Sequence, residues 1–90
     1  MKYIIVKGSH GLELPFIFAA NISHADMARK IINPHGWDTE QEFKDNIYSA
    51  GFVVLTDKGL ECYGKSHTLN IGTQKIDSKL INRMLGKRIA

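Results

Sequence analysis

The stretch YIIVKGSHGLELPFIFA, residues 3–19, predicts a β-hairpin and decides the fold class. Residues 3–7 are β-branched or otherwise apolar on both faces, which is typical of a buried strand. In Gly8–Gly11, two glycines bracket polar residues, as in a hairpin connection. Residues 12–19 place Leu and Phe at alternate positions, as in a half-buried strand. Because Pro15 cannot donate a ladder hydrogen bond, we expect this strand at a sheet edge.

A short helix is predicted next, over residues 24–32. Ser23 and Asp26 have the spacing of a capping box, with Asp in place of the usual Glu, and apolar residues follow at helical spacing. The run Asn33–Gly36 contains Pro and Gly and ends the helix. Residues 38–45 are acidic, and their periodicity leaves a short helix and an ordered loop as alternatives.

A second hairpin is predicted from residues 48–55 and 60–71, with a turn signal between them. Leu60 lies at an even position and Leu69 at an odd one, so a regular strand would place them on opposite faces. A β-bulge near Gly64 would bring both onto the core face. The alternative is a strand that ends early or crosses from one neighbour to another.

The last predicted element is a helix whose apolar face repeats every 3.6 residues, formed by Ile76, Leu80, Ile81, Met84 and Leu85. The order β-β-α-β-β-α indicates an α+β fold. We expect an antiparallel four-stranded sheet with two helices packed on one face. A length of 90 residues fits one small domain over residues 1–90.

Composition excludes several protein classes. With 43% hydrophobic residues the chain is too apolar to be wholly disordered. No apolar run approaches the roughly 18 residues of a membrane span, so no membrane partner is expected. The first residues lack the long apolar region and cleavage site of a signal peptide. Cys62 is the only cysteine, which excludes an intrachain disulfide and fits a reducing, cytoplasmic setting.

The net charge of +3 is unevenly distributed. Residues 75–90 hold five basic residues and one acidic residue, a net of +4, whereas residues 1–74 hold seven basic and eight acidic, a net of −1. Functionally, the basic end could contact phosphates or an acidic protein surface. The alternative is a solvated helix face with a tail that complements the helix dipole. The candidate partner-binding residues are Lys75, Lys79, Arg83, Lys87 and Arg88.

No constellation of residues indicates catalysis. Cys62 could act as a nucleophile with His67 as its base. Positions five apart on a regular strand point to opposite faces, so we interpret Cys62 as a small core residue. Residues 59–66 match the pattern G-x-x-x-x-G-K-[ST]. Because a predicted strand fills this loop and no helix follows it, we treat the match as chance.

Metal binding has weak candidates. His24 with Asp26, and His35 with Asp38, could each supply two ligands. A structural zinc site needs four ligands, and these candidates are dispersed along the chain. We therefore expect neither a metal nor a cofactor.

Several short motifs resemble those of small uncharacterised proteins encoded by bacteriophages and prophages. They are Ser23–Asp26, Ser49–Phe52, Cys62–Ser66 with Leu69, and an ending with Asp77, Leu80, Ile81 and Asn82. The resemblance implies a small soluble accessory protein of the bacterial cytoplasm. It implies no particular activity or site residue.

The leading hypothesis is a non-enzymatic binding protein that acts through protein contacts, with another protein or a second copy of itself as partner. Its acidic and basic segments could pair between two copies and give a homodimer. The second hypothesis is nonspecific nucleic-acid binding through the basic C-terminal helix and tail. The third is a small enzyme that uses Cys62 or a histidine.

Overall fold

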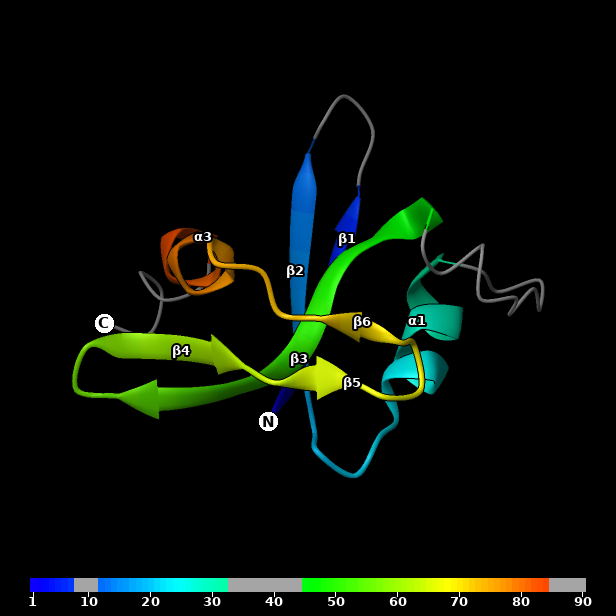
Figure 1. The fold of residues 1–90 in the computed structure, drawn as a ribbon, viewed down its shortest axis with the longest axis horizontal. Coiled ribbons are helices and arrows are strands. Elements are labelled where there is room, and N and C mark those ends of the chain that lie inside the picture. The colour runs from blue at the N-terminus through cyan, green and yellow to red at the C-terminus, as the bar shows by residue number, and fades with distance from the viewer. Residues whose placement is uncertain (8–11, 33–44, 85–90) are drawn as a thin grey trace.

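A computed structural model describes residues 1–7, 12–32 and 45–84, which form a four-stranded sheet, a two-stranded ribbon and two helices (Figure 1). The elements, in chain order, are β1 (Lys2–Lys7), β2 (Glu13–Phe18), α1 (His24–Ile32), β3 (Ile47–Thr56), β4 (Gly59–Tyr63), β5 (Lys65–Ser66), β6 (Ile71–Gly72) and α3 (Asp77–Met84). The predicted connection Gly8–Gly11, most of the acidic segment 38–45, and the basic residues Lys87 and Arg88 lie outside the described residues.

The main sheet is antiparallel, with the strand order β2-β1-β3-β4. This arrangement confirms the predicted α+β class and the four-stranded antiparallel sheet. β2 is an edge strand, as Pro15 predicted, and Pro15 pairs with Ile5 of β1. β3 is the longest strand, and its two halves have different partners. Its first part pairs with β1 and its last part with β4, so the β3–β4 hairpin extends away from β1 and β2 (Figure 1).

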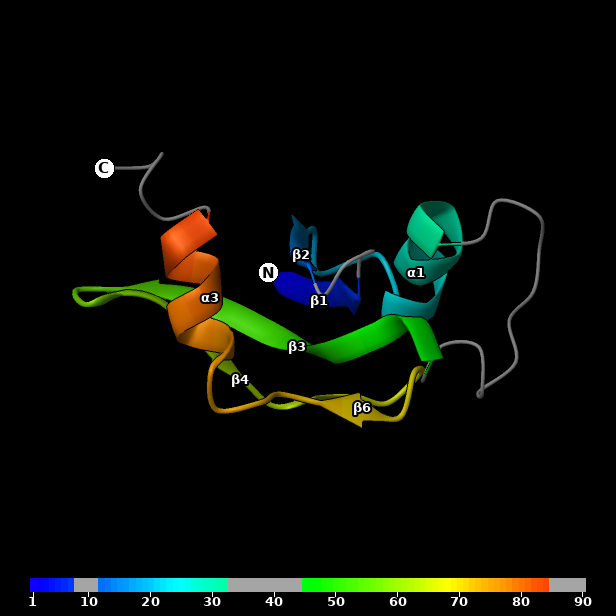
Figure 2. The same ribbon diagram turned by 90° about the horizontal axis from the view of Figure 1, so that it is seen from above.

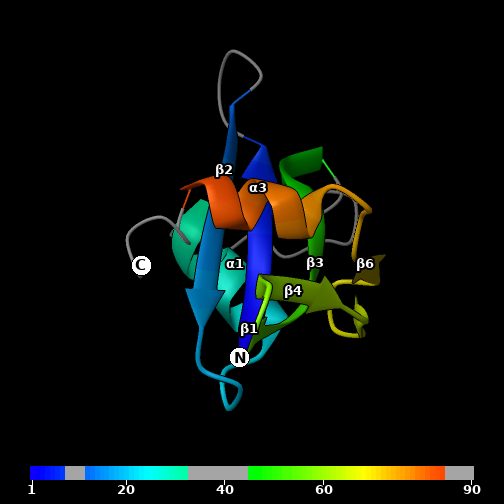
Figure 3. The same cartoon turned by 90° about the vertical axis from the view of Figure 1, so that its left-hand side faces the viewer.

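The two helices lie on opposite faces of the sheet, so the prediction that both pack on one face is wrong. The alternating residues of β1 show this. Ile4 belongs to the core beneath α1, whereas Tyr3 and Ile5 belong to the core beneath α3. Figures 2 and 3 show β1 and β2 between the two helices. A strand that is apolar on both faces needs an apolar layer on each face to exclude water from it.

Two hydrophobic cores result, one for each helix. The core beneath α1 contains Ile4, Val6, Phe18, Ala25, Ala28, Ile47, Ala50 and Leu69. The core beneath α3 contains Tyr3, Ile5, Val53, Leu60, Leu80 and Ile81. The sheet separates these two small cores, so side chains at neighbouring positions of β1 contribute to different clusters.

The segment predicted as one strand over residues 60–71 is broken at Gly64, which has a φ of 81°. β4 ends before this glycine, and the chain continues as the short β5–β6 ribbon. Leu60 therefore reaches the core beneath α3, and Leu69 reaches the core beneath α1. The early ending of the strand, and not a bulge that brings both leucines to one face, accounts for their opposite parity.

Helix α1 begins and ends where the sequence predicted. The hydroxyl of Ser23 accepts a hydrogen bond from the backbone N–H of Asp26 at 3.0 Å. A second cap comes from the turn between β5 and β6, where Thr68 Oγ1 accepts from the N–H of Ala25 at 3.2 Å. These bonds satisfy two of the four N–H groups that lack partners at a helix start, and they fasten the ribbon to α1.

Candidate functional site

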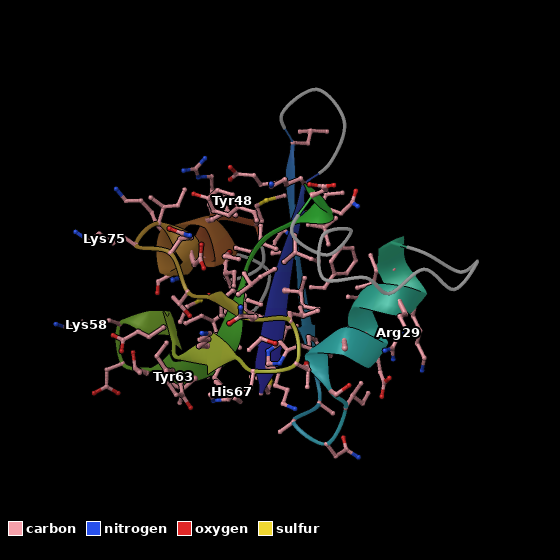
Figure 4. All side chains as sticks on the ribbon, turned by 45° about the vertical axis from the view of Figure 1, so that its right-hand side comes forward. Arg29, Tyr48, Lys58, Tyr63, His67 and Lys75 are labelled. Carbon is pink, nitrogen blue, oxygen red and sulfur yellow. The ribbon has the colours of Figure 1, made fainter. Side chains whose placement is uncertain are left out.

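Helix α3 carries its basic residues on the side opposite the core. Lys79 and Arg83 are exposed, and so is Lys75, which immediately precedes the helix. Leu80 and Ile81 are buried against the sheet. In Figure 4 the side chain of Lys75 points away from the body of the protein. We call Lys75, Ile76, Lys79, Arg83 and Met84 the α3 ridge.

The ridge combines charge with exposed apolar surface. Ile76 and Met84, which helical spacing grouped with Leu80 and Ile81 on the apolar face, are 47% and 39% exposed, so only Leu80 and Ile81 of that group reach the core. The cations recur every four residues, which at a rise of 1.5 Å per residue separates them by about 6 Å along a helix. Within the described residues, none of the three forms an ion pair with a carboxylate, whereas Arg29 of α1 pairs with Asp26. The ridge cations are therefore available to an outside anion.

A buried polar cluster fixes the start of α3. The hydroxyl of Tyr3 donates to Oδ2 of Asp77 at 2.5 Å and lies 2.9 Å from Thr73 Oγ1. The same carboxylate oxygen accepts from the N–H of Gln74 at 2.9 Å. Burial raises the pKa of the Tyr3 hydroxyl, and the hydrogen bond to Asp77 raises it further. Oδ1 of Asp77 is buried and has no hydrogen-bond partner among the described residues.

Cys62 lies beside the core beneath α3 and is half-buried. Burial raises the pKa of its thiol, which disfavours the thiolate that a nucleophile needs. His67 is an exposed residue between β5 and β6 (Figure 4). No hydrogen bond joins Cys62 and His67 in the part of the chain that the structure describes.

His24 was expected to be a surface or capping residue rather than a metal ligand, and the structure buries it. Its Nε2 lies 2.7 Å from the carbonyl oxygen of Gly51, and its ring packs edge-on against Phe18 and Phe52. Burial lowers the pKa of the imidazole, the bond to Gly51 opposes this effect, and the charge of Lys2 lowers the pKa further. His24 thus connects α1 to the two strands that flank β1.

The candidate metal ligands are not assembled. Asp26 is exposed and bonds to Arg29, while His24 is buried, and the second pair, His35 and Asp38, lies outside the described residues. Over residues 1–7, 12–32 and 45–84, no group of three His, Cys, Asp or Glu side chains is placed to hold a metal ion.

The phosphate-loop pattern of residues 59–66 forms no phosphate-binding loop. Residues 59–63 are β4, Gly64 turns the chain, and residues 65–66 are β5. The hydroxyl of Ser66 is buried and accepts from the N–H of Leu69 at 3.2 Å. A phosphate loop leads into a helix whose N–H groups face the ligand, and here a turn follows instead.

A second exposed surface lies on the β3–β4 hairpin, on the side away from α3. Phe52 and Tyr63 are cross-strand partners whose rings stack with centroids 5.7 Å apart. Tyr63 is 55% exposed and Val54, two residues along β3 from Phe52, is 44% exposed. We call Phe52, Val54 and Tyr63 the hairpin patch. Sequence reasoning missed it because three residues from two strands become neighbours only through the pairing register.

Comparison with protein-family models, with curated protein sequences and with solved structures finds no match for this chain. Among the described residues, no helix is long and apolar enough to cross a membrane. Any assignment of function therefore depends on the two exposed surfaces and on the buried groups beneath them.

Proposed function

We propose that this chain is a non-enzymatic binding protein whose α3 ridge contacts an acidic surface of another protein. The observation that carries the proposal is the composition of the ridge, in which three cations with no ion pair among the described residues occur together with exposed Ile76 and Met84. Met and Arg are enriched in protein interfaces, and charged residues at the rim of an interface steer a partner of opposite charge. We further propose a cytoplasmic accessory role, as in the bacteriophage and prophage proteins that the sequence resembles.

The support of the ridge favours binding over catalysis. Asp77 and Tyr3 lock the start of α3 to the sheet, and Leu80 and Ile81 pack beneath it. A helix held at its start and along its inner face presents the outer cations in a fixed geometry. Rigid presentation lowers the entropy lost when a partner binds.

Nucleic acid is the alternative ligand of the same cations. Phosphate contacts need only positive charge, so they would leave Ile76 and Met84 without a role. A protein partner uses both kinds of side chain. We therefore favour the protein partner, and binding to DNA or RNA is the competing outcome of the experiment.

The test compares two charge reversals of equal size. Lys79→Glu changes the ridge, whereas Lys30→Glu changes an exposed lysine of α1. Both proteins, and the unchanged protein, are used to capture partners from bacterial extract treated with nuclease. We expect one protein to be retained by the unchanged chain and by Lys30→Glu but lost with Lys79→Glu. Equal retention by all three would contradict the proposal.

A second measurement separates the two ligand classes. Labelled DNA and RNA are titrated at low salt with the same three proteins. Salt-dependent binding that only Lys79→Glu removes would assign the ridge to nucleic acid and overturn the choice of a protein partner. We expect no such binding.

A further inference from the structure

We infer that the outer edge of β4 is a site of strand addition, which α3 closes and which the same edge of a second copy of this chain occupies when α3 moves away. The edge consists of the backbone groups of Leu60 and Cys62 that point away from β3 and toward α3. The inference does not rest on the α3 ridge, because Ser78 and Asn82 contact β4 whereas the ridge cations face solvent.

Two side chains of α3 make the bonds that a neighbouring strand would make. The amide of Asn82 accepts from the N–H of Leu60 at 2.8 Å and donates to the carbonyl of Leu60 at 2.7 Å. Two residues directly opposite each other in an antiparallel ladder exchange the same pair of bonds. The hydroxyl of Ser78 accepts from the N–H of Cys62 at 2.8 Å, and α3 lies beside β4 in Figures 1 and 3. These are the bonds that an incoming strand would have to replace.

The position of Asn82 at this edge is closely defined. Its Nδ2 also donates to the carbonyl of Ser78 at 2.7 Å, so the amide is bonded to its own helix as well as to β4. A Cβ on Gly59 would lie 2.7 Å from Asn82 Oδ1, and Gly59 has a φ of 111°. The glycine therefore leaves room for the amide to reach the strand. The fold uses a specific contact to satisfy this edge and does not leave it to water.

The opposite edge of the sheet, formed by β2, is blocked in a different way. The N–H of Val53 donates to the carbonyl of Met1 at 3.0 Å, so alternate residues of β1 from Met1 to Ile5 bond to β3. Pro15 is the β2 partner of Ile5, and its nitrogen therefore faces outward. Because proline has no N–H, the β2 edge lacks a donor there. The β4 edge keeps its donors and depends on α3 for protection.

Helix α3 can leave β4 without breaking the sheet. It contributes no strand pairing, and β4 is held by its own pairing with β3, from Phe52 with Tyr63 to Thr56 with Gly59. The helix has eight residues, and isolated helices of this length are marginal in water, so its stability depends on its contacts with the sheet. Weakening those contacts raises the population of a form in which the β4 edge is free.

A second copy supplies an edge that complements this one. With the two β4 strands antiparallel and Leu60 opposite Leu60, the two copies exchange the pair of bonds that Asn82 makes within one chain. This register places Glu61 opposite Gly59 of the other copy, so that the two glutamates are not directly opposed. The contact is two-fold symmetric and joins two sheets into one through backbone hydrogen bonds.

The experiment uses the peptide KGLECY, residues 58–63, as a substitute for the β4 strand of a second copy. A matched peptide carries N-methyl groups on residues 60–62, which removes the donors of both strand edges and keeps every side chain. Both peptides are titrated, in reducing buffer, against the unchanged protein, Asn82→Ala, Ser78→Ala and Gln74→Ala. Gln74 is exposed just before α3, so its variant is the control. NMR spectra report binding at β4, and hydrogen exchange reports the opening of its amides.

We expect the Leu60 amide to exchange at least about tenfold faster in Asn82→Ala than in the unchanged protein, because its acceptor is lost. The KGLECY peptide should bind Asn82→Ala at least about tenfold more tightly than it binds the unchanged protein or Gln74→Ala, and it should slow this exchange again. The methylated peptide should not bind. Sedimentation of Asn82→Ala without peptide should show a dimer that increases with concentration, and circular dichroism checks that the variant is folded.

Three results would overturn the inference. Equal binding of the peptide to the unchanged protein and to Asn82→Ala would show that α3 does not close the edge. Equal binding of the methylated peptide would assign the contact to apolar side chains and not to strand pairing. An Asn82→Ala protein whose Leu60 amide exchanges faster, but which neither binds the peptide nor dimerises, would show a free edge that adds no strand. If Asn82→Ala does not fold, Ser78→Ala decides the same three questions at Cys62.

Discussion

The side chain of Asn82 pairs with the backbone of Leu60 as a neighbouring strand would. Its Oδ1 accepts from the N–H of Leu60 at 2.8 Å, and its Nδ2 donates to the carbonyl of Leu60 at 2.7 Å. One turn earlier, the hydroxyl of Ser78 accepts from the N–H of Cys62 at 2.8 Å. Helix α3 thus satisfies the outer edge of β4, which protects that edge from pairing with another chain.

This relationship predicts the effect of removing the amide. Asn82→Ala leaves the N–H and the carbonyl of Leu60 without their partners in a partly buried place. We expect the free energy of unfolding to fall by about 1–3 kcal/mol. Urea unfolding followed by circular dichroism measures the change. Gln74→Ala, an exposed change just before α3, serves as the control, and a similar loss in both variants would refute the role of Asn82.

Two glycines predict opposite responses to the same substitution. A Cβ on Gly51 would collide with Thr73 Oγ1 and lie 2.6 Å from the backbone carbonyl of Tyr63. On Gly72 it would meet nothing nearer than 3.9 Å. We expect Gly51→Ala to lower the stability by about 2–3 kcal/mol, because backbone must move. Gly72→Ala should be neutral or slightly stabilising, since alanine restricts the unfolded chain.

Thermal unfolding of the two variants tests the contrast. The two glycines lie on different strands but the added group is identical, so the comparison isolates the space around each position. Equal stabilities for Gly51→Ala and Gly72→Ala would show that Thr73 and the Tyr63 carbonyl can move away from β3 without cost.

His24 predicts that acid weakens the fold. Burial holds the pKa of its imidazole below the ordinary value of 6.5 in the folded chain, while the unfolded chain takes up a proton near that ordinary value. The free energy of unfolding is therefore unaffected by His24 above about pH 6.5. It decreases as the pH falls below this value, because protonation of His24 favours the unfolded chain. The protonated ring would also carry its charge beside Lys2 and at the positive end of α1.

The measurement is the free energy of unfolding between about pH 7 and about pH 5, where most carboxylates stay ionised. His24→Gln should remove most of the pH dependence in this window, although it also lowers the stability at pH 7. His67→Gln changes an exposed histidine and should retain the slope of the unchanged protein. A slope that survives His24→Gln would assign the acid sensitivity to another group.

Local signals account for the parts of the fold that the sequence could predict. Ser23 caps the helix three residues before Asp26, and Pro15 excludes a central strand, so neither inference needs distant residues. The apolar residues on both faces of β1 already indicated that one helix lies on each face of the sheet. A strand buried on both faces requires cover on both, which the expectation of helices on one face overlooked.

The two candidate surfaces also differ in how far local sequence patterns could predict them. The exposure of Lys79 and Arg83 follows from helical periodicity within one element, so the cations of the α3 ridge could be predicted. The exposure of Ile76 and Met84 could not, because the same periodicity groups them with the buried Leu80 and Ile81. The hairpin patch depends on the pairing of Phe52 with Tyr63, and the bond between Tyr3 and Asp77 joins residues 74 positions apart. Such contacts are set by strand register and by packing between distant elements. Neither can be predicted from short patterns in a single sequence.

The bond between Tyr3 and Asp77 leads to the last prediction. Tyr3→Phe removes the hydroxyl that donates to Oδ2 of Asp77. The other oxygen of this carboxylate, Oδ1, already lacks a hydrogen-bond partner among the described residues. We expect the free energy of unfolding to fall by about 2–3 kcal/mol, because a hydrogen bond to a buried charged group is lost. Tyr48→Phe removes a hydroxyl that has no hydrogen bond within the described residues and should cost much less.

A double-mutant cycle separates this bond from the packing of the tyrosine ring. Asp77→Asn keeps the shape of the side chain but removes its charge, so it should cost less in the Tyr3→Phe background than in the unchanged protein. We expect a coupling free energy of about 1–3 kcal/mol from urea unfolding of the four proteins. Additive losses would mean that Tyr3 acts through its ring alone, and that α3 is held to the sheet by Leu80, Ile81 and Asn82 without help from the buried carboxylate.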